Sequence, residues 1–189
     1  MKASHRLHHI GAPLPWWKPL LISALTALLV LFGFGLGRDP SFLPSALIGK
    51  PLPAFDLASL GGGDPIRAAS LAGKPMIINF WASWCGACRT EHDVLLELGQ
   101  KLAPAGKVQV LGINFRDTTD NAQRFLNERG AFPYPSASDP AGRTGIDFGV
   151  YGLPETFFVA ADGKILARHV GALTPQDAEK YLRGMGAGL

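Results

Sequence analysis

The stretch that decides the fold is MIINFWASWCGAC, residues 76–88. Its first part, residues 76–81, is a short apolar run rich in branched and aromatic side chains, which predicts a buried strand. The segment that follows, EHDVLLEL at residues 91–98, has apolar side chains at helical spacing. Cys85 and Cys88 are therefore expected at a strand-to-helix junction, where free backbone N–H groups and the helix dipole favour negative charge.

This position favours a redox-active pair of thiols. A helix N-terminus lowers the pKa of a cysteine thiol, which produces a thiolate nucleophile near neutral pH. The two intervening residues place Cys88 one helical turn from Cys85, within range for a disulfide. The sequence therefore predicts a redox dithiol.

Two other interpretations of the cysteine pair have less support. These are the only two cysteines of the 189-residue chain, so a four-thiolate zinc site is excluded. A zinc site completed by His92 and His169 has no ligand-like spacing behind it. A purely structural disulfide across so small a loop would constrain the unfolded chain little. Redox chemistry is preferred, and no metal site is expected.

The positive charge of the chain is confined to its beginning. The formal net charge is +3, from 18 basic and 15 acidic residues. Residues 1–38 hold four basic residues and no acidic one, which is +4, whereas the rest holds 14 basic and 15 acidic residues, which is −1. No basic patch indicates nucleic-acid binding. The basic excess is instead typical of the region around a membrane anchor.

An apolar run supports that anchor. From Leu20 to Leu36 there are 17 residues without a charge, at the lower limit for a membrane-spanning helix. Trp16 and Trp17 precede the run, as expected at a membrane interface. A cleavable signal peptide is the alternative, but the long run and the lack of a clear small-residue cleavage site favour an uncleaved anchor.

The positive-inside rule then sets the topology, with the N-terminus in the cytoplasm. The expected parts are a cytoplasmic tail at 1–19, a transmembrane signal anchor in the lipid bilayer at 20–37, a linker at 38–53 and an exported domain at 54–189. In a bacterium this describes a single-pass protein of the inner membrane with its C-terminal domain in the periplasm, an oxidising compartment.

The remaining segments predict an α/β domain. Strands are expected at 54–57 and 108–115, and a hairpin around Asp162-Gly163 is expected to join strands at 155–160 and 164–170. Helices are expected from Thr118 or Thr119 to Gly130, from Ala141 to Phe148, and from Thr174-Pro175 onward. This order predicts an α/β sheet with helices on both faces.

Residues 50–186 resemble thioredoxin, with Trp-Cys-x-x-Cys at the first strand–helix junction and a proline just before the hairpin. Two runs, WCGACRTEH at 84–92 and GVYGLPETF at 149–157, point to a smaller group of proteins within the thioredoxin superfamily. Together with the anchor, the length and GINFRD at 112–117, they are similar to the membrane-anchored thiol:disulfide interchange proteins of cytochrome c maturation, the DsbE/CcmG type. The resemblance implies a thioredoxin-like fold, in which a central mixed sheet has helices on both faces, and it implies thiol–disulfide exchange.

The resemblance also assigns roles at the site. Cys85 is expected to face solvent and attack a substrate disulfide, and Cys88 to resolve the mixed disulfide, which leaves Cys85–Cys88 oxidised and the substrate reduced. Trp84 is expected to shield the sulfurs. Leu153 and Pro154 are expected to share a cis peptide bond that presents a backbone edge to an extended substrate peptide. Trp84, Leu153 and Pro154 are thus the expected substrate-binding residues.

Acidic residues complete the expected site. Asn79 stands where ordinary thioredoxins place a buried aspartate, so the usual internal base is missing, and the resemblance makes Glu91 and Glu155 the acids near the dithiol. Glu91 lies one turn after Cys88, so the two share a helix face, and a partly desolvated carboxylate there could relay the proton that Cys88 loses. The competing interpretation is that both glutamates are ordinary solvated acids. Arg89 either stabilises a thiolate or faces water.

Three functions fit these observations. The first is a reductase of cytochrome c biogenesis, acting on the C-x-x-C-H cysteines of apocytochrome c or on a partner thiol protein. Its electrons would come from a membrane thiol-transfer protein, because residues 39–189 contain no glycine-rich nucleotide motif and no cofactor is expected. The second is a general extracytoplasmic dithiol reductase. The third is a Cu(I) chaperone that uses both thiolates, and it ranks last because no third ligand stands at an obvious spacing.

Overall fold

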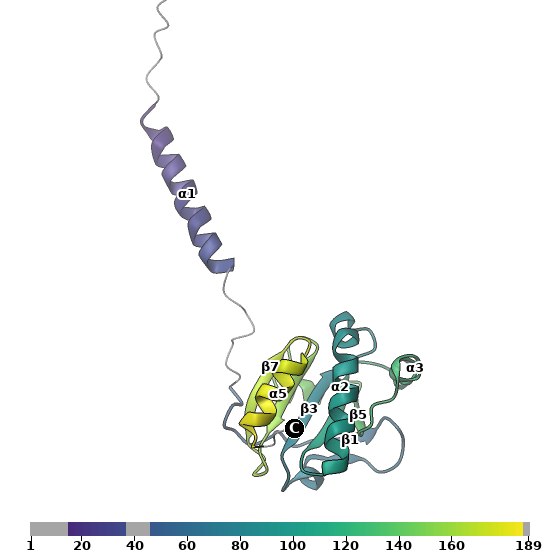
Figure 1. Cartoon of the computed structure of the whole chain (residues 1–189). Coiled ribbons are helices and arrows are strands. Elements are labelled where there is room, and N and C mark those ends of the chain that lie inside the picture. The colour runs from purple at the N-terminus through teal and green to yellow at the C-terminus, as the bar shows by residue number, and fades with distance from the viewer. Residues whose placement is uncertain (1–14, 37–45, 187–189) are drawn as a thin grey trace, which may run out of the picture. The chain divides into compact units, whose positions relative to one another are not determined.

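A computed structural model of the chain describes residues 15–36 and 46–186 (Figure 1). The chain divides into two compact units, residues 1–42 and 43–189, which are described separately. Most of the expected cytoplasmic tail at 1–19 and about half of the expected linker at 38–53 lie outside the described residues.

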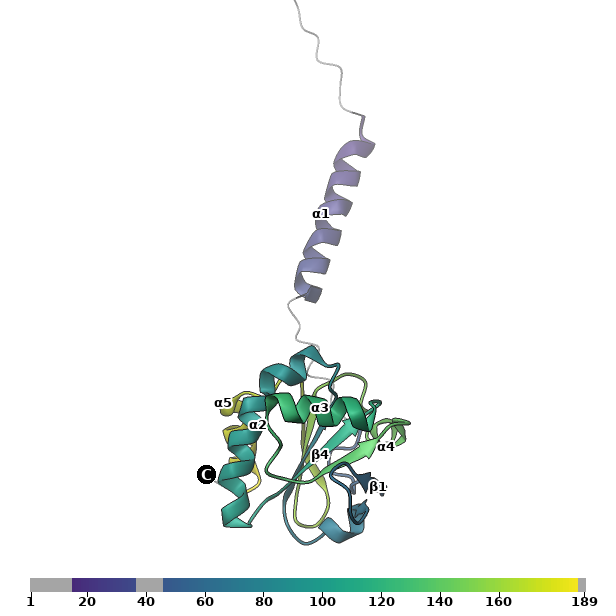
Figure 2. The same cartoon turned by 90° about the vertical axis from the view of Figure 1, so that its right-hand side faces the viewer.

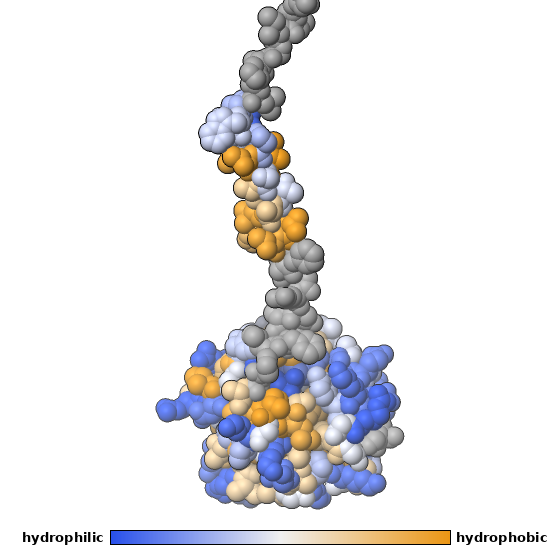
Figure 3. All heavy atoms as spheres, turned by 90° about the vertical axis from the view of Figure 1, so that its left-hand side faces the viewer, coloured by the Kyte–Doolittle hydropathy of each residue, from blue (hydrophilic) through white to orange (hydrophobic). Residues whose placement is uncertain are grey.

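The described part of the first unit is the helix α1 (Trp17–Leu36). Its large apolar side chains, from Trp17 to Phe32, are exposed, and the leucine, isoleucine, valine and phenylalanine side chains among them form much of the orange surface of this helix in Figure 3. Within residues 15–36 and 46–186, no helix combines the length and the apolar character needed to cross a membrane.

The described part of the second unit is built on one seven-stranded sheet, in the order β2-β1-β5-β4-β3-β6-β7. The strands are β1 (Asp56–Ser59), β2 (Ile66–Arg67), β3 (Met76–Trp81), β4 (Gln109–Phe115), β5 (Ser136–Asp139), β6 (Glu155–Val159) and β7 (Ile165–Val170). β4 runs parallel to both β3 and β5, and the other neighbouring pairs are antiparallel. The predicted mixed sheet is confirmed.

Helices pack on both faces of this sheet (Figures 1 and 2). They are α2 (Gly86–Ala105), α3 (Thr119–Arg129), α4 (Arg143–Asp147), α5 (Pro175–Gly184) and a short 3-10 turn, η2 (Ala68–Leu71). On one face, Ile77 of β3 packs with Leu95 of α2 and Leu182 of α5. On the other face, Phe80 packs with Phe148, the residue directly after α4. The predicted thioredoxin-like arrangement of layers is confirmed.

Local sequence signals account for most of the element boundaries. Thr118 is the N-cap residue of α3, and Thr174 forms a capping box with Asp177 at the start of α5. The Asp162-Gly163 turn joins β6 and β7, with Gly163 at a φ of +81° that glycine adopts readily.

The N-terminal hairpin differs from the sequence-based prediction. β1 begins two residues later than expected, and neither β2 nor η2 was predicted. The strand β2 has two residues and exists through its antiparallel pairing with β1, in which Leu57 lies opposite Ile66. So short a strand has no periodicity of its own in the sequence.

The loop before β5 packs so closely on Gly99 of α2 that an alanine at this position should destabilise the protein. A Cβ at Gly99 would come within 2.6 Å of both Pro133 Cγ and Tyr134 Cδ1. We expect Gly99→Ala to lower the free energy of unfolding by about 1–3 kcal/mol, although alanine is the better helix former. Gly184→Ala in α5 is the control, because its Cβ meets no atom within 4 Å. Urea unfolding measures both, and equal stability of the two variants would contradict the packing described here.

Candidate active site

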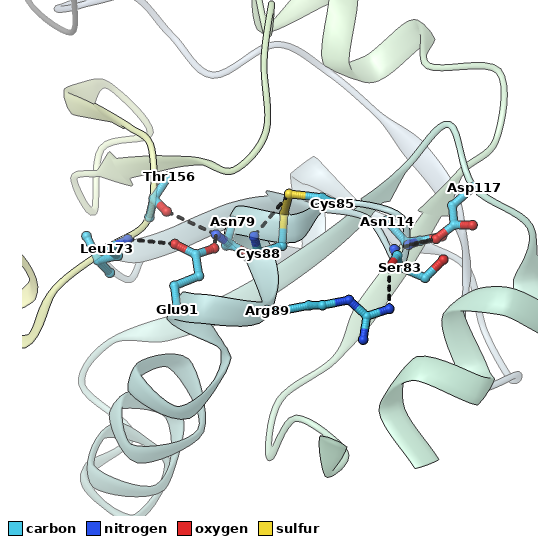
Figure 4. Close-up of a disulfide and its surroundings, with 10 residues drawn as sticks. All are labelled: Asn79, Ser83, Cys85, Cys88, Arg89, Glu91, Asn114, Asp117, Thr156 and Leu173. Atoms are coloured by element: carbon cyan, nitrogen blue, oxygen red, sulfur yellow. Dashed lines mark hydrogen bonds between the residues drawn. A yellow bond between two sulfur atoms is a disulfide. The ribbon is translucent and has the colours of Figure 1, made fainter. Parts of the chain in front are cut away.

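The cysteine pair lies where β3 ends and α2 begins. Cys85 is the N-cap residue of α2, and its Sγ accepts a hydrogen bond from the backbone N–H of Cys88 at 3.0 Å. The two cysteines form a disulfide with their Cα atoms 5.3 Å apart (Figure 4). The predicted strand-to-helix position of the pair is confirmed.

Both cysteines are buried in the disulfide form, Cys85 with 5% and Cys88 with 3% of its surface exposed. The expectation of a solvent-facing Cys85 is therefore wrong for this form of the protein. The reason is packing: both cysteines belong to a buried cluster that includes Trp81 of β3 and Phe125 of α3, and Leu153 packs against it.

Hydrogen bonds from the segment after β4 hold the loop that leads into Cys85. The backbone N–H of Ser83 donates to Asp117 Oδ2 at 2.7 Å, and the Trp84 Nε1–H donates to the Arg116 carbonyl oxygen at 3.0 Å. Arg89 Nη2 donates to the Ser83 carbonyl oxygen at 3.0 Å (Figure 4). Arg89 thus bonds to the loop backbone, an arrangement that neither interpretation from the sequence included.

Two aromatic rings on the segments around the disulfide are exposed. Trp84 has 59% of its surface exposed, and its expected role in shielding the sulfurs stays a prediction. Tyr151, in the loop before Pro154, has 61% of its surface exposed. The Arg168 guanidinium lies 4.7 Å from the centroid of its ring. These rings are available for contact with a partner.

Glu91 is almost completely buried on the inner side of α2, with 1% of its surface exposed. Its Oε1 accepts a hydrogen bond from Asn79 Nδ2 at 2.9 Å and its Oε2 accepts one from the backbone N–H of Leu173 at 2.7 Å (Figure 4). Burial raises the pKa of Glu91 to about 7, and the two hydrogen bonds reduce that rise. Glu91 is therefore poised to take up or release a proton near neutral pH.

Glu155 is also buried, but its partners differ. Its Oε1 accepts hydrogen bonds from the backbone N–H groups of Tyr151 and Gly152 at 3.0 and 3.2 Å, and its Oε2 pairs with Arg168, whose Nε lies at 2.6 Å. Arg168 also donates to the carbonyl oxygen of Gly149. This carboxylate therefore fastens the loop before Pro154. The interpretation of Glu91 and Glu155 as solvated acids is wrong, because both are buried and hydrogen-bonded.

The structure also places the other sequence-derived features. The Leu153–Pro154 peptide bond is cis. His92 Nε2 is hydrogen-bonded to the Gly130 carbonyl oxygen, and His169 Nε2 to that of Ala172. In the part of the chain that the structure describes, no three His, Cys, Asp or Glu side chains are grouped to hold a metal ion.

Three polar residues of the site were missed by sequence reasoning. Asp117 holds the active-site loop and Arg168 holds Glu155, while Thr156 Oγ1 accepts a hydrogen bond from Asn79 at 3.0 Å. Asp117 lies in the GINFRD run and Thr156 in the GVYGLPETF run, so both were within quoted motifs. Arg168 had no local signal, because its partner is 13 residues away across a hairpin.

Comparison with known proteins agrees with this geometry. The Redoxin family model matches residues 47–182. The chain is 42% identical over 180 residues to the thiol:disulfide interchange protein HelX of Rhodobacter capsulatus, covering 90% of this chain and 97% of the relative. The chain belongs to the Redoxin family. It is a thiol–disulfide oxidoreductase of the DsbE/HelX group.

Further relatives support the same placement. The chain is 42% identical over 150 residues to the thiol:disulfide interchange protein DsbE of Escherichia coli K12, covering 78% of each chain. A crystal structure of a DsbE from Chlorobium tepidum matches with a TM-score of 0.65 and 32% identity, covering 74% of this chain and 96% of the other. The thioredoxin-like fold and the family resemblance read from the sequence are confirmed.

The raised pKa of Glu91 predicts a stability that falls as the pH rises. The folded state holds the Glu91 proton more tightly than the unfolded chain, where the pKa is near 4.5. The stabilisation is fully present below about pH 4.5 and is lost as the pH rises to about 7, with an upper bound of about 3 kcal/mol. Urea unfolding between pH 4 and 8 should show this decline in the wild type and not in Glu91→Gln. Glu97→Gln, an exposed site on the same helix, should keep the wild-type profile. A wild-type profile in Glu91→Gln would contradict the assignment.

Proposed function

We propose that this oxidoreductase reduces disulfides in exported proteins during the maturation of c-type cytochromes. The observation that carries the proposal is a buried carboxylate, Glu91, whose pKa is raised by burial to about 7 and which lies one helical turn after the resolving cysteine, Cys88. The similarity to HelX and DsbE over most of the chain adds support.

The proposed reaction is a two-step thiol–disulfide exchange. In the reduced protein the Cys85 thiolate attacks one sulfur of the substrate disulfide, which breaks that disulfide, forms a mixed disulfide and releases one substrate thiolate. The Cys88 thiolate then attacks Cys85 Sγ, which forms the Cys85–Cys88 disulfide and releases the second substrate thiolate. Two electrons pass from the dithiol to the substrate.

Glu91 has the proposed role of accepting the proton that Cys88 loses before the second step. Its two hydrogen-bond partners, an amide and a backbone N–H, are neutral, so no cation within residues 15–36 and 46–186 is hydrogen-bonded to it. A carboxylate with a pKa of about 7 matches the operating pH of such a proton transfer. Glu155 is a less suitable proton acceptor, because an arginine and two backbone N–H groups already occupy its oxygens.

The proposed substrate-binding surface consists of Trp84, Leu153 and Pro154. The exposed ring of Trp84 and the loop at Leu153–Pro154 come from the two segments that carry or cover the disulfide. An extended peptide can pair with the backbone edge of this loop, in the manner of an added strand. Tyr151 is exposed in the same loop, and we include it in the proposed surface.

The proposed substrates are the C-x-x-C-H cysteines of apocytochrome c, or a partner thiol protein of that route. The proposal rests on the resemblance of the WCGACRTEH and GVYGLPETF runs, and on the need of haem attachment for free thiols in a compartment that oxidises them. Regeneration of the dithiol then needs electrons from a membrane thiol-transfer protein.

A trapping experiment tests this function. Cys88→Ser removes the resolving thiol, so substrates should remain disulfide-bonded to Cys85 in the protein's own host and be identifiable by mass spectrometry. An apocytochrome c or a dedicated thiol protein of its maturation is the expected adduct. The control is the double variant Cys85→Ser/Cys88→Ser, which should trap nothing. A broad set of unrelated exported proteins would favour a general reductase, and no adduct on folded, exported protein would contradict the proposal.

We also propose that residues 20–37 attach the domain to the bacterial inner membrane, with residues 38–189 in the periplasm. The absence of charge from Leu20 to Leu36 and the exposed apolar side chains of α1 support this attachment. Cell fractionation tests it. The full chain should sediment with membranes through a high-salt wash, and a variant lacking residues 2–37 should not. Recovery of both proteins in the soluble fraction would contradict attachment.

A further inference from the structure

The backbone leaves β4 through a residue in an unusual conformation. The strand ends at Phe115, and Arg116 has a φ of +47°, in the left-handed region. Among residues 15–36 and 46–186 it is the only residue other than glycine with a positive φ. A side chain makes this region unfavourable, and residues that adopt it cluster at functional sites, where surrounding contacts hold them.

Three contacts hold Arg116 in this conformation. Its backbone N–H donates to the Asp139 carbonyl oxygen at 3.0 Å, which extends the pairing of β4 with β5. Its guanidinium lies 5.1 Å from the centroid of the Phe115 ring. Gly142 leaves room for the arginine side chain, because a Cβ at Gly142 would lie 2.5 Å from Arg116 Nε. The turn after β4 is therefore fixed by the sheet and by the start of α4.

This turn presents two hydrogen-bond acceptors to the loop between β3 and α2. The carbonyl oxygen of Arg116 accepts a hydrogen bond from Trp84 Nε1–H at 3.0 Å. The next residue, Asp117, accepts one from the backbone N–H of Ser83 at 2.7 Å (Figure 4). Two successive residues of the turn thus bind two successive residues of the loop, directly before Cys85.

The carboxylate of Asp117 is itself held in place. Its Oδ2 also accepts a hydrogen bond from Asn114 Nδ2 at 3.1 Å, and its Oδ1 accepts one from the backbone N–H of Thr118 at 2.8 Å. Asp117 and Asn114 are both buried. Donors on both oxygens fix the orientation of the carboxylate, so Asp117 is a rigid acceptor for Ser83.

The indole of Trp84 is held at its polar edge and is otherwise largely exposed. Its N–H is bonded to the Arg116 carbonyl oxygen, whereas 59% of the surface of the residue is exposed. A tryptophan whose N–H is already satisfied offers a large apolar face to a partner. A side chain that is ordered before binding loses less conformational entropy when the partner binds. The ring is therefore oriented in advance for contact with a substrate.

We propose that Asp117 is a positioning residue for substrate binding, which acts through Ser83 and the Trp84 ring. The backbone carbonyl of Arg116 is the second support of that ring. The inference rests on the proposed substrate-binding surface, to which Trp84 belongs. Asp117 then governs the capture of a peptide disulfide and not the reactivity of Cys85, whose sulfur has its own donor in the backbone N–H of Cys88.

Stopped-flow kinetics of the first exchange step tests this role in the full chain. In a Cys88→Ser background the Cys85 thiolate attacks a peptide whose one cysteine is disulfide-bonded to thionitrobenzoate. The mixed disulfide forms, and the thionitrobenzoate that leaves reports the rate by its absorbance. Trp84→Phe keeps an aromatic ring without the N–H, and Asp117→Ala removes the support of the loop. Each should raise the half-saturating peptide concentration about three- to tenfold, with the limiting rate unchanged.

Two controls separate the ring from the sulfur. Hydroxyethyl disulfide has no side chain that could contact Trp84, so it should react at the same rate in both variants as in their parent. Asp120→Ala removes the same charge from an exposed position in the first turn of α3 and should keep the parent's peptide kinetics. In Trp84→Phe/Asp117→Ala the peptide kinetics should equal those of Trp84→Phe, because Asp117 acts through the ring.

Several results would overturn the proposal. Unchanged peptide kinetics in Trp84→Phe, a change at an exposed position, would do so whether or not Asp117→Ala folds. A folded Asp117→Ala would do so if it bound the peptide normally, or if it slowed hydroxyethyl disulfide as much as the peptide. Effects of Trp84→Phe and Asp117→Ala that multiply in the double variant would also contradict it. None of these results depends on which adduct is trapped in the host, so failure of the proposed cytochrome substrate is a separate outcome.

Discussion

The first turn of α2 is the constraint on which the site depends. Its backbone N–H at Cys88 bonds to Cys85 Sγ, so the helix N-terminus acts on the sulfur that the mechanism uses as nucleophile. The same turn places Cys88 and Glu91 on the buried side of the helix, against Asn79 of β3. Strand, helix and sheet face must all be in place before the chemistry can occur, which explains why the site lies at their junction.

The two buried glutamates have different roles because their hydrogen-bond partners differ. Glu91 has neutral donors, and burial raises its pKa to about 7, so it can exchange a proton. Glu155 accepts hydrogen bonds from an arginine and from two backbone N–H groups. These bonds hold the loop that carries the cis proline. Burial alone does not make a carboxylate a proton carrier. The charge of the groups bonded to the carboxylate decides whether it can serve as one.

Much of the fold and part of the site could be predicted from the sequence, because their signals are local. The strand at 76–81, the cap at Thr118, the turn at Asp162-Gly163 and the cysteine spacing all act over a few residues. Features made by distant contacts could not be predicted. Arg168 meets Glu155 across a hairpin, and Cys85 is buried in a cluster that includes Phe125 of α3 and against which Leu153 packs.

The central claim is that Glu91 takes the proton of Cys88 during resolution of the mixed disulfide. The most direct test is the rate of resolution as a function of pH. A peptide joined to Cys85 by a mixed disulfide is released when Cys88 attacks, and stopped-flow measurement between pH 5 and 9 follows that release. The account predicts a rate that rises with pH through a midpoint near 7 in the wild type. In Glu91→Gln the rate at pH 7 should be lower, and it should rise only at higher pH as the Cys88 thiol ionises alone. The same rate and the same midpoint in both proteins would contradict the account.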